Sequence, residues 1–515
     1  MSNWASGYVS EVDYTHGYYR ELSPALLSLA LLNKGVNAAH GRPLRYLELG
    51  FGQGLSLNIH AATCPGEYWG TDFNPAQAAN AKEIAEASGS GARIFDLSFA
   101  ELAARDDLPE FDVIALHGIW SWISDENRAV VVDLARRKLA VGGVLYNSYN
   151  TTPGWSPAMP LRHLMTLHAE LAGSDAQGIT AKIDGALAFT QRVVDSGALY
   201  FRANAAVAER LKKIKDQNKN YLAHEYFNRD WHPMPFSQAA ELLSPAKLQF
   251  AASANLLDHI DEVSLTTEGK QLLGEISHPL LKESVRDYFV NQQFRKDIFV
   301  KGARVITPLE RLERYSNQSF ILVRSPADVP MKLAGPIGEV TLQEAVYKPL
   351  LEILAESNHA PKSVKQILVH PLWKQQSLPN LVQSLMVLTG AGHIYPTQEP
   401  EMVKAAQARS KKLNTYLCKR ARDSNEINFL ASPVTGGGIQ VNRFQQLFLV
   451  ARHTGKKQPA EWAAFVWELI SKQGQRLVKD GKTIESAEEN LAELTAQANA
   501  FAEKQLPILK ALGIE

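Results

Sequence analysis

The sequence has almost no cysteine and no excess of either charge. Among its 515 residues there are only two cysteines, Cys64 and Cys418, and no Cys/His cluster has the spacing of a zinc site. Two thiols so far apart favour free cysteines in a reducing compartment over a disulfide framework. The 54 basic and 54 acidic side chains balance, so no overall charge draws the protein to nucleic acid or to an anionic membrane.

Long hydrophobic runs are missing as well. The first apolar run, residues 24–32, is too short to span a bilayer and fits an amphipathic helix instead. The N-terminus has no basic segment of the kind that opens a secretory signal. With 45% hydrophobic and 21% charged residues, the composition is that of an ordinary globular protein. We expect a cytoplasmic protein with no membrane insertion and no metal, divided into roughly three domains.

The most informative stretch that is present is Glu48-Leu-Gly-Phe-Gly-Gln-Gly54, which follows a short apolar run and precedes apolar residues at helical spacing. This pattern predicts a strand, a tight turn and a helix. Glycine reaches positive φ at little cost and lets a ligand approach the backbone, while the first N–H groups of the helix point at that ligand. Leu55 stands where a dinucleotide fingerprint needs its third glycine, and no Lys-Ser/Thr pair follows, so both that fingerprint and a phosphate loop are excluded.

The next hundred residues continue an alternation of strands and helices. Strands are predicted over five ranges: 45–49, 67–72, 93–96, 111–116 and 144–148. A helix that begins at Pro75, with Asn74 as its cap, follows the second strand. Asp72 ends that strand, 24 residues after Glu48, and Asp96 ends the third. Ligands bind at this edge of open α/β sheets, where an acid accepts hydrogen bonds from ribose hydroxyls; a turn-forming aspartate is the alternative.

Residues 150–230 interrupt the alternation with long amphipathic helical stretches, and an insertion at this place often forms a lid over a ligand. Within it, residues 224–233 hold two histidines, two acids and three aromatics. Because burying so many polar groups is costly unless each is bonded, a site is favoured over a local cluster of caps and aromatics. Beyond the insertion we predict a helix at 236–243, a strand at 248–254, a helix at 281–299 and, as the last antiparallel edge of the sheet, a strand at 320–324.

The pattern changes after a predicted linker at residues 326–335. Residues 361–396 predict two helices, a glycine turn and a short strand, which is a winged-helix arrangement. Such a module can bind DNA through its second helix, but residues 378–388 contain neither Lys nor Arg, so protein contact is favoured. Residues 401–515 are predicted to be helical. We expect this half to serve acceptor recognition or assembly and to be dispensable for cofactor binding.

Five motifs in order carry a resemblance to a known family. They are residues 17–24 (Gly-Tyr-Tyr-Arg-Glu-Leu-Ser-Pro), the glycine loop, residues 117–124 (His-Gly-Ile-Trp-Ser-Trp-Ile-Ser), residues 149–155 and residues 221–228. The chain resembles class I S-adenosylmethionine-dependent methyltransferases that carry a methyltransferase regulatory domain, which include the rickettsial-type outer-membrane-protein lysine methyltransferases. The Asn/Asp-Pro-Pro-aromatic motif of enzymes that methylate nucleobase amino groups is absent after the fourth strand.

The resemblance implies an α/β fold: a Rossmann-like methyltransferase sheet with a helical insertion, then a mostly helical, winged-helix-like C-terminal half. The implied domains are a methyltransferase domain over 1–325 with a lid at about 151–230, a regulatory domain over 331–400 and a helical domain over 401–515. The implied cofactor is S-adenosyl-L-methionine, with Asp72 on its ribose and Asp96 on its adenine. The predicted cofactor contacts are Glu48, Gly50, Phe51, Gly52, Gln53, Gly54, Asp72, Phe73, Asp96 and His117.

The resemblance also implies methyl transfer to a protein lysine. A lysine amine has an unperturbed pKa of about 10.4 and must arrive without its proton, which desolvation among aromatic rings favours. We expect aromatic walls, with His117 or Glu225 orienting the amine or taking its proton. The predicted reaction site is His117, Glu225, Tyr18, Trp120, Tyr149 and Trp155. For His117 a satisfied histidine at a strand end is the alternative. A small-molecule methyltransferase and a non-catalytic cofactor-binding regulator are the competing hypotheses, and a homodimer is one option for assembly.

Overall fold

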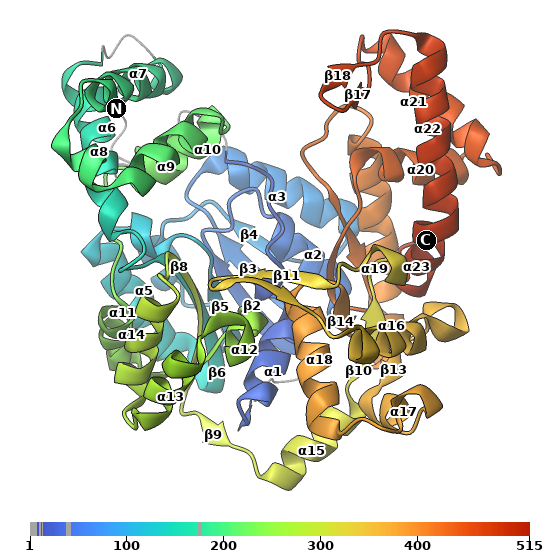
Figure 1. Cartoon of the computed structure of the whole chain (residues 1–515), viewed down its shortest axis with the longest axis horizontal. Coiled ribbons are helices and arrows are strands. Elements are labelled where there is room, and N and C mark those ends of the chain that lie inside the picture. The colour runs from blue at the N-terminus through green and yellow to red at the C-terminus, as the bar shows by residue number, and fades with distance from the viewer. Residues whose placement is uncertain (1–7, 10–11, 13, 38–42, 174–177) are drawn as a thin grey trace.

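A seven-stranded sheet forms the centre of the N-terminal half (Figure 1). The computed structural model describes residues 8–9, 12, 14–37, 43–173 and 178–515. The strand order is β4-β3-β2-β5-β6-β8-β7, in which β2 to β6 are parallel and β8 is antiparallel to both of its neighbours. The strands are β2 (Leu44–Leu49), β3 (Gly66–Thr71), β4 (Arg93–Phe95), β5 (Phe111–Leu116), β6 (Leu139–Asn150), β7 (Leu248–Ser253) and β8 (Phe294–Lys301).

Four helices connect the parallel strands: α2 (Leu55–Thr63), α3 (Pro75–Ser88), α4 (Phe99–Ala103) and α5 (Asp125–Lys138). As predicted, Asn74 caps α3, and its side chain accepts hydrogen bonds from two backbone N–H groups of the first turn. The three glycines of the loop before α2 all have positive φ, between 58° and 72°. A Cβ on Gly54 would lie 2.4 Å from Cβ of Ala81, so this loop needs glycine for space as well as for conformation.

The predicted insertion is helical and stands apart from the sheet, at the upper left of Figure 1. It consists of α6 (Met159–Leu171), α7 (Ile179–Asp195), α8 (Leu199–Ala203), α9 (Ala205–Lys215) and α10 (Lys219–Tyr226). It has its own apolar core, in which Leu161 and Met165 of α6 pack with Ile183 and Leu187 of α7. The last turn of α10 carries the chain back to the edge of the sheet.

Two predicted elements are corrected. The helix predicted at 281–299 ends early: α14 spans Pro279–Phe289, and the residues after it form β8, which lies inside the sheet between β6 and β7. The charged residues of β8, Arg295 and Asp297, are buried together, whereas charges in a sequence window normally indicate a solvent face. The strand at 320–324 also exists, as β10 (Ser319–Leu322), but it pairs with β13 (Lys362–Ser363) and β14 (Ile394–Pro396) in a separate sheet.

The remaining elements of the N-terminal half surround the sheet. They are η2 (Arg20–Leu22), α1 (Pro24–Asn33), β1 (Val36–Asn37), η3 (Trp120–Trp122), α11 (Phe236–Leu243), η6 (Leu256–His259), α12 (Asp261–Ser264), α13 (Thr267–Glu275), β9 (Arg304–Val305) and α15 (Pro308–Asn317). Neither Cys64 nor Cys418 forms a disulfide, and both are buried. No helix within the described ranges is long and apolar enough to cross a membrane.

The C-terminal half is mostly helical. The predicted linker contains a strand of the hairpin β11 (Lys332–Gly335) and β12 (Gly338–Thr341). Three helices then flank the small sheet that holds β10: α16 (Glu344–His359), α17 (Val364–Leu368) and α18 (Leu378–Gly390). Five α-helices, two hairpins and a π-helical turn complete the chain: α19 (Pro400–Arg420), β15 (Phe429–Ser432), β16 (Gly437–Gln440), α20 (Arg443–His453), α21 (Pro459–Lys472), β17 (Val478–Lys479), β18 (Lys482–Thr483), α22 (Ala487–Ala500), η9 (Phe501–Gln505) and α23 (Leu506–Ala511).

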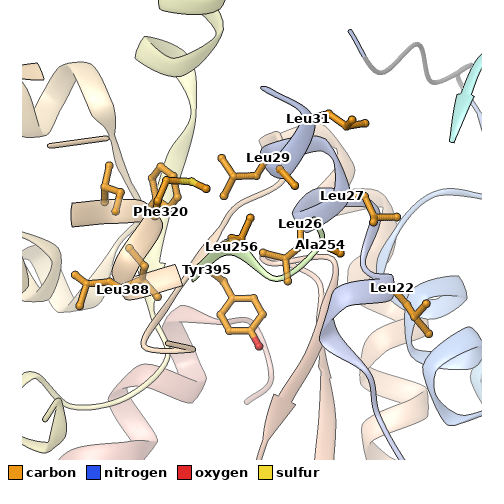
Figure 2. Close-up of a cluster of buried hydrophobic side chains, with 14 of the residues drawn as sticks. Leu22, Leu26, Leu27, Leu29, Leu31, Ala254, Leu256, Phe320, Leu388 and Tyr395 are labelled. Carbon is orange, nitrogen blue, oxygen red and sulfur yellow. The ribbon is translucent and has the colours of Figure 1, made fainter. Parts of the chain in front are cut away.

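The two halves share a hydrophobic core around α1. Figure 2 shows Leu26 and Leu29 of α1 among Leu256 from the first half and Phe320 and Leu388 from the second. A second shared cluster buries side chains of α2 against α19 and the β15–β16 hairpin. The boundary between the halves is therefore crossed by continuous packing, although a linker was predicted there.

Candidate active site

A cavity opens at the carboxyl ends of β2, β3 and β5, the sheet edge where the sequence places its acidic residues. Its empty volume, including the open mouth, is about 1290 Å³, more than small-molecule sites usually need. Six segments line it: the N-terminal segment, the glycine loop, the end of β3 with the start of α3, the loop between β4 and α4, the loop after β5 with the start of α5, and the last turn of α10 with the loop after it. We call it the sheet-edge cavity.

The floor of the sheet-edge cavity is the glycine loop, with Glu48 just before it. The Glu48 side chain is only 3% exposed, and its Oε2 atom has no hydrogen-bond partner. Burial raises the pKa of this carboxyl to about 8. A buried oxygen that lacks a partner is costly, so an ammonium group from a bound ligand would relieve the cost and restore the charged form.

Asp72 holds the loop against the end of β3. Its two carboxylate oxygens accept hydrogen bonds from the backbone N–H of Gly52 at 2.9 Å and of Asn74 at 3.0 Å. Burial raises its pKa to about 6, although these two bonds act in the opposite direction. The sequence offered a ligand role and a turn-forming role as alternatives, and the structure places Asp72 in the cavity wall while it also makes the turn contacts.

His117 forms the opposite wall, directly after β5. Its Nδ1 atom lies 2.9 Å from the Tyr146 hydroxyl, and the ring of Tyr19 stacks on the imidazole with centroids 3.8 Å apart. Burial lowers the pKa of His117 to about 3, outweighing the opposite effect of nearby Glu21. At neutral pH the cavity therefore presents an uncharged imidazole, held by aromatic and hydroxyl partners.

Glu225 enters the cavity from the last turn of α10, next to His224. Burial raises the pKa of Glu225 to about 7. The Tyr14 ring meets the imidazole of His224 edge-on at 5.1 Å, and Tyr8 lies 5.4 Å from the same ring. The lid and the N-terminal segment thus join over the sheet edge, and they bring a titratable carboxyl among aromatic rings.

The predicted site residues fall into two groups. Those that line the sheet-edge cavity are Glu48, Gly50, Phe51, Gly52, Gln53, Asp72, Phe73, His117 and Glu225; those that lie outside its lining are Gly54, Asp96, Tyr18, Trp120, Tyr149 and Trp155. Asp96 points to solvent and pairs with Lys82 at 3.6 Å. The next residues along the chain, Leu97, Ser98 and Phe99, line the cavity at that place.

Of the four aromatics outside the lining, Tyr18 and Trp120 each have a near neighbour in the chain that lines the cavity instead. Tyr18 packs on Gly437 and Gly438 of the C-terminal half, whereas Tyr19 faces the cavity, because successive residues of an extended segment point to opposite sides. Trp120 is fully buried in the core, and its neighbour Trp122 lines the cavity instead.

Tyr149 and Trp155 are buried and make contacts within the protein. The Tyr149 hydroxyl donates to Asp297 at 2.7 Å. The Trp155 ring lies beneath the guanidinium of Arg210, which is 3.8 Å from its centroid. Tyr19 and Trp122 lie in the motifs of residues 17–24 and 117–124, and Tyr14 lies just before the first of these, but only the backbone direction shows which aromatic faces a ligand.

Comparison with known proteins agrees with this geometry. Residues 47–143 match the family model described as a methyltransferase domain, and residues 218–301 match the one described as a predicted methyltransferase regulatory domain. The uncharacterized protein sll1526 of Synechocystis sp. is 40% identical over 514 residues, which cover 99% of each chain. The chain belongs to the family of methyltransferases with a methyltransferase regulatory domain.

More distant relatives share the architecture of this methyltransferase. The uncharacterized protein RP789 of Rickettsia prowazekii is 23% identical over 529 residues, covering 96% of this chain and 92% of the relative. The structure of PKMT2 from Rickettsia typhi in complex with AdoHcy superposes with a TM-score of 0.69 at 17% identity, covering 94% of this chain and 98% of that chain. A second PKMT2 structure gives 0.69 at 18% identity. The predicted class I methyltransferase fold is confirmed.

The protein is an S-adenosyl-L-methionine-dependent methyltransferase, and its cavity fits that cofactor. The partnerless Oε2 of Glu48 suits the ammonium group of the methionine part, and the loop from Gly50 to Gln53 leaves the backbone open to close approach. Asp72, directly after β3, lines the same cavity. Among the described residues, no group of three or more His, Cys, Asp or Glu side chains is arranged to hold a metal ion.

Proposed function

We propose that this enzyme methylates the side-chain amine of a lysine in a protein. The observation that supports the proposal most directly is Glu225, whose half-buried carboxyl has a pKa raised to about 7 inside a cavity walled by Tyr14 and Tyr19. Aromatic faces attract a cationic ammonium group, and a carboxylate binds it. A carboxyl with a pKa near neutrality also suits proton transfer from that ammonium.

The chemistry follows from these positions. The bound cofactor supplies a methyl group on a sulfonium, so the protein needs to align a neutral amine with that methyl group and exclude water. Glu225 accepts the proton that leaves the lysine ammonium. The neutral imidazole of His117, fixed by Tyr146 and Tyr19, adds no positive charge beside the sulfonium. Tyr14 and Tyr19 desolvate the amine and thereby favour its uncharged form.

The comparisons support the same acceptor class. The similarity to the rickettsial PKMT2 extends over 94% of this chain, and it suggests a protein-lysine acceptor. The resemblance noted in the sequence extends this proposal to a bacterial protein of the outer-membrane type. The partner is then another protein, which has to reach the mouth of the sheet-edge cavity with one extended side chain.

The test is transfer of a radiolabelled methyl group from the cofactor to cell lysate, separated into protein and small-molecule fractions. The proposal is supported if the labelled protein yields methylated lysine after acid hydrolysis. A labelled band in the membrane fraction of the lysate would support an acceptor of the outer-membrane type. Label confined to small molecules would show the competing small-molecule activity. We expect Glu225→Gln to reduce protein labelling by about 10²–10⁴-fold if it acts as the base, while Glu209→Gln, on the exposed side of the same lid, leaves it unchanged.

A further inference from the structure

A second cavity lies beside the first residues of β8 and shares no lining residue with the sheet-edge cavity. It is enclosed by η6, α14, the ends of β7 and β8, and Lys34 at the end of α1, and its empty volume with the mouth is about 530 Å³. We call it the β8 cavity. Apart from Lys34, all of its lining residues fall within residues 218–301, the segment that matches the regulatory-domain model.

A buried carboxylate in the lining of the β8 cavity has a hydrogen-bond partner on only one of its two oxygens. The Asp287 side chain is 4% exposed, and its Oδ1 accepts a hydrogen bond from Arg295 at 2.5 Å. Its Oδ2 is buried and has no partner. Arg295 is shared with Asp297 at 2.8 Å and with Glu283 at 3.2 Å, so one guanidinium serves three carboxylates.

Two other cations of the lining, Arg286 and Lys296, form ion pairs with acids that do not line the cavity. Arg286 pairs with Asp261 at 2.6 Å, and Lys296 pairs with Glu21 at 2.5 Å; neither acid lines the cavity. Asp258 accepts hydrogen bonds from Ser253 at 2.7 Å and Asn255 at 2.8 Å, which are neutral donors.

The charge that remains is negative. The carboxylates are Asp258, Glu283, Asp287 and Asp297, and the only cations of the described lining left to balance them are Arg295 and Lys34. Two negative charges are therefore uncompensated. In agreement, burial together with neighbouring carboxylates raises the pKa of Asp287 to about 7, against the opposing effect of Arg295.

We propose that the β8 cavity is a binding site for a small organic cation, held through a primary ammonium group by Asp287 and Glu283. An ammonium has three donors and would supply the partner that Asp287 Oδ2 lacks. A metal ion fits less well, because no group of three or more acidic, His or Cys side chains within the described residues is arranged as a metal site. The site shares no lining residue with the sheet-edge cavity.

The test measures binding and needs no methyl transfer, so it is independent of the acceptor proposed above. The full-length protein is titrated at pH 8, above the pKa of Asp287, with 1,4-diaminobutane, and separately with 1,4-butanediol, which has the same length without charge. We expect saturable binding and a higher melting temperature with the diamine alone. No saturable binding at millimolar concentration, equal binding of the diol, or an equal response to calcium chloride would overturn the proposal.

Four variants locate the site. Asp287→Asn and Glu283→Gln are each expected to weaken diamine binding about tenfold or more, because each removes a charged acceptor; Glu283 is 26% exposed, so its variant folds even if the buried one does not. Lys34→Met is expected to strengthen binding, since Lys34 is the internal cation that competes for the same acids. Glu262→Gln, an exposed neighbour whose carboxylate pairs with Lys270, is the control and should bind like wild type. Unchanged binding in Asp287→Asn and Glu283→Gln, or weaker binding in Lys34→Met, would contradict the assignment.

Discussion

Lys296 Nζ lies 2.5 Å from Glu21 Oε1, although 275 residues separate the two in the chain. Lys296 belongs to β8 and lines the β8 cavity, whereas Glu21 lies in the short helix η2, next to Tyr19, which stacks on His117. Burial alone would raise the pKa of Glu21, but the Lys296 ammonium outweighs it and lowers that pKa. This ion pair therefore fixes the N-terminal segment at the wall of the sheet-edge cavity.

Removing the ammonium is expected to destabilise the protein. Lys296→Met leaves Glu21 largely buried without its counter-charge, at a cost of about 1–3 kcal/mol. Because the folded-state pKa of Glu21 is lowered, the pair's contribution is present above the unfolded value of 4.5 and is lost as the pH falls through the folded one. Melting temperatures of variant and wild type should thus differ at pH 7.5 and converge below pH 4.5. Lys348→Met, which breaks an exposed pair with Glu344, should change little at either pH.

Glu225 should show the opposite dependence. Its pKa is raised from 4.5 to about 7, so the folded state holds its proton more tightly than the unfolded state, and stability falls as the pH rises between these values. Glu225→Gln should therefore be as stable as wild type at pH 4.5 and more stable, by about 1–2 kcal/mol, at pH 8. Activity of the wild type should rise with the pH through about 7 as Glu225 loses its proton. A variant that is less stable at pH 8 would show that Glu225 makes structural contacts in its charged form.

Substitutions of Asp72 and Asp96, the two acids that the sequence assigned to the cofactor, should affect cofactor affinity differently. Asp72→Ala removes the acceptor for the Gly52 and Asn74 N–H groups and the ribose ligand that we predict from the sequence, so the affinity for S-adenosylhomocysteine should fall by at least about tenfold. Asp96→Ala removes a solvent-exposed carboxylate and should leave that affinity unchanged. Calorimetric titration of both variants measures the difference. An equal loss in the two would place Asp96 on the cofactor, as the sequence suggested.

Truncation gives the sharpest contrast with the expectation from sequence. A chain that ends after Pro326 was expected to retain cofactor binding, but α2, which follows the glycine loop, buries Leu55 and Ile59 in a cluster with α19. Exposing such large apolar side chains costs roughly 1.5–3 kcal/mol each. The loss of several of them is comparable to the whole free energy of unfolding of a typical domain. We expect the truncated protein to aggregate or to melt far below the full chain. A soluble truncated protein that binds S-adenosylhomocysteine normally would show that the N-terminal half folds alone.

The sequence by itself determined the parts of this protein that rest on local chemistry. Three glycines at alternate positions, the cap and proline at Asn74 and Pro75, and apolar runs at strand length define the glycine loop, α3 and the five parallel strands, because each depends on neighbours within a few residues. The position of Glu48 and Asp72 at strand ends followed from the same alternation. These features were enough to predict an α/β sheet with a ligand site at its edge, and the resemblance to class I methyltransferases added the cofactor.

Only the tertiary structure decided which side chains face a ligand and which segments pair at long range. Tyr18 and Tyr19 are adjacent and chemically alike, yet one packs on Gly438 and the other stacks on His117. β8 contains charges that a sequence window assigns to solvent, but Arg295 pairs with Asp287 and Asp297 only once α14 and β8 are folded together. A side chain's direction and a buried charge's partner both depend on segments distant in the chain, and no local pattern contains that information.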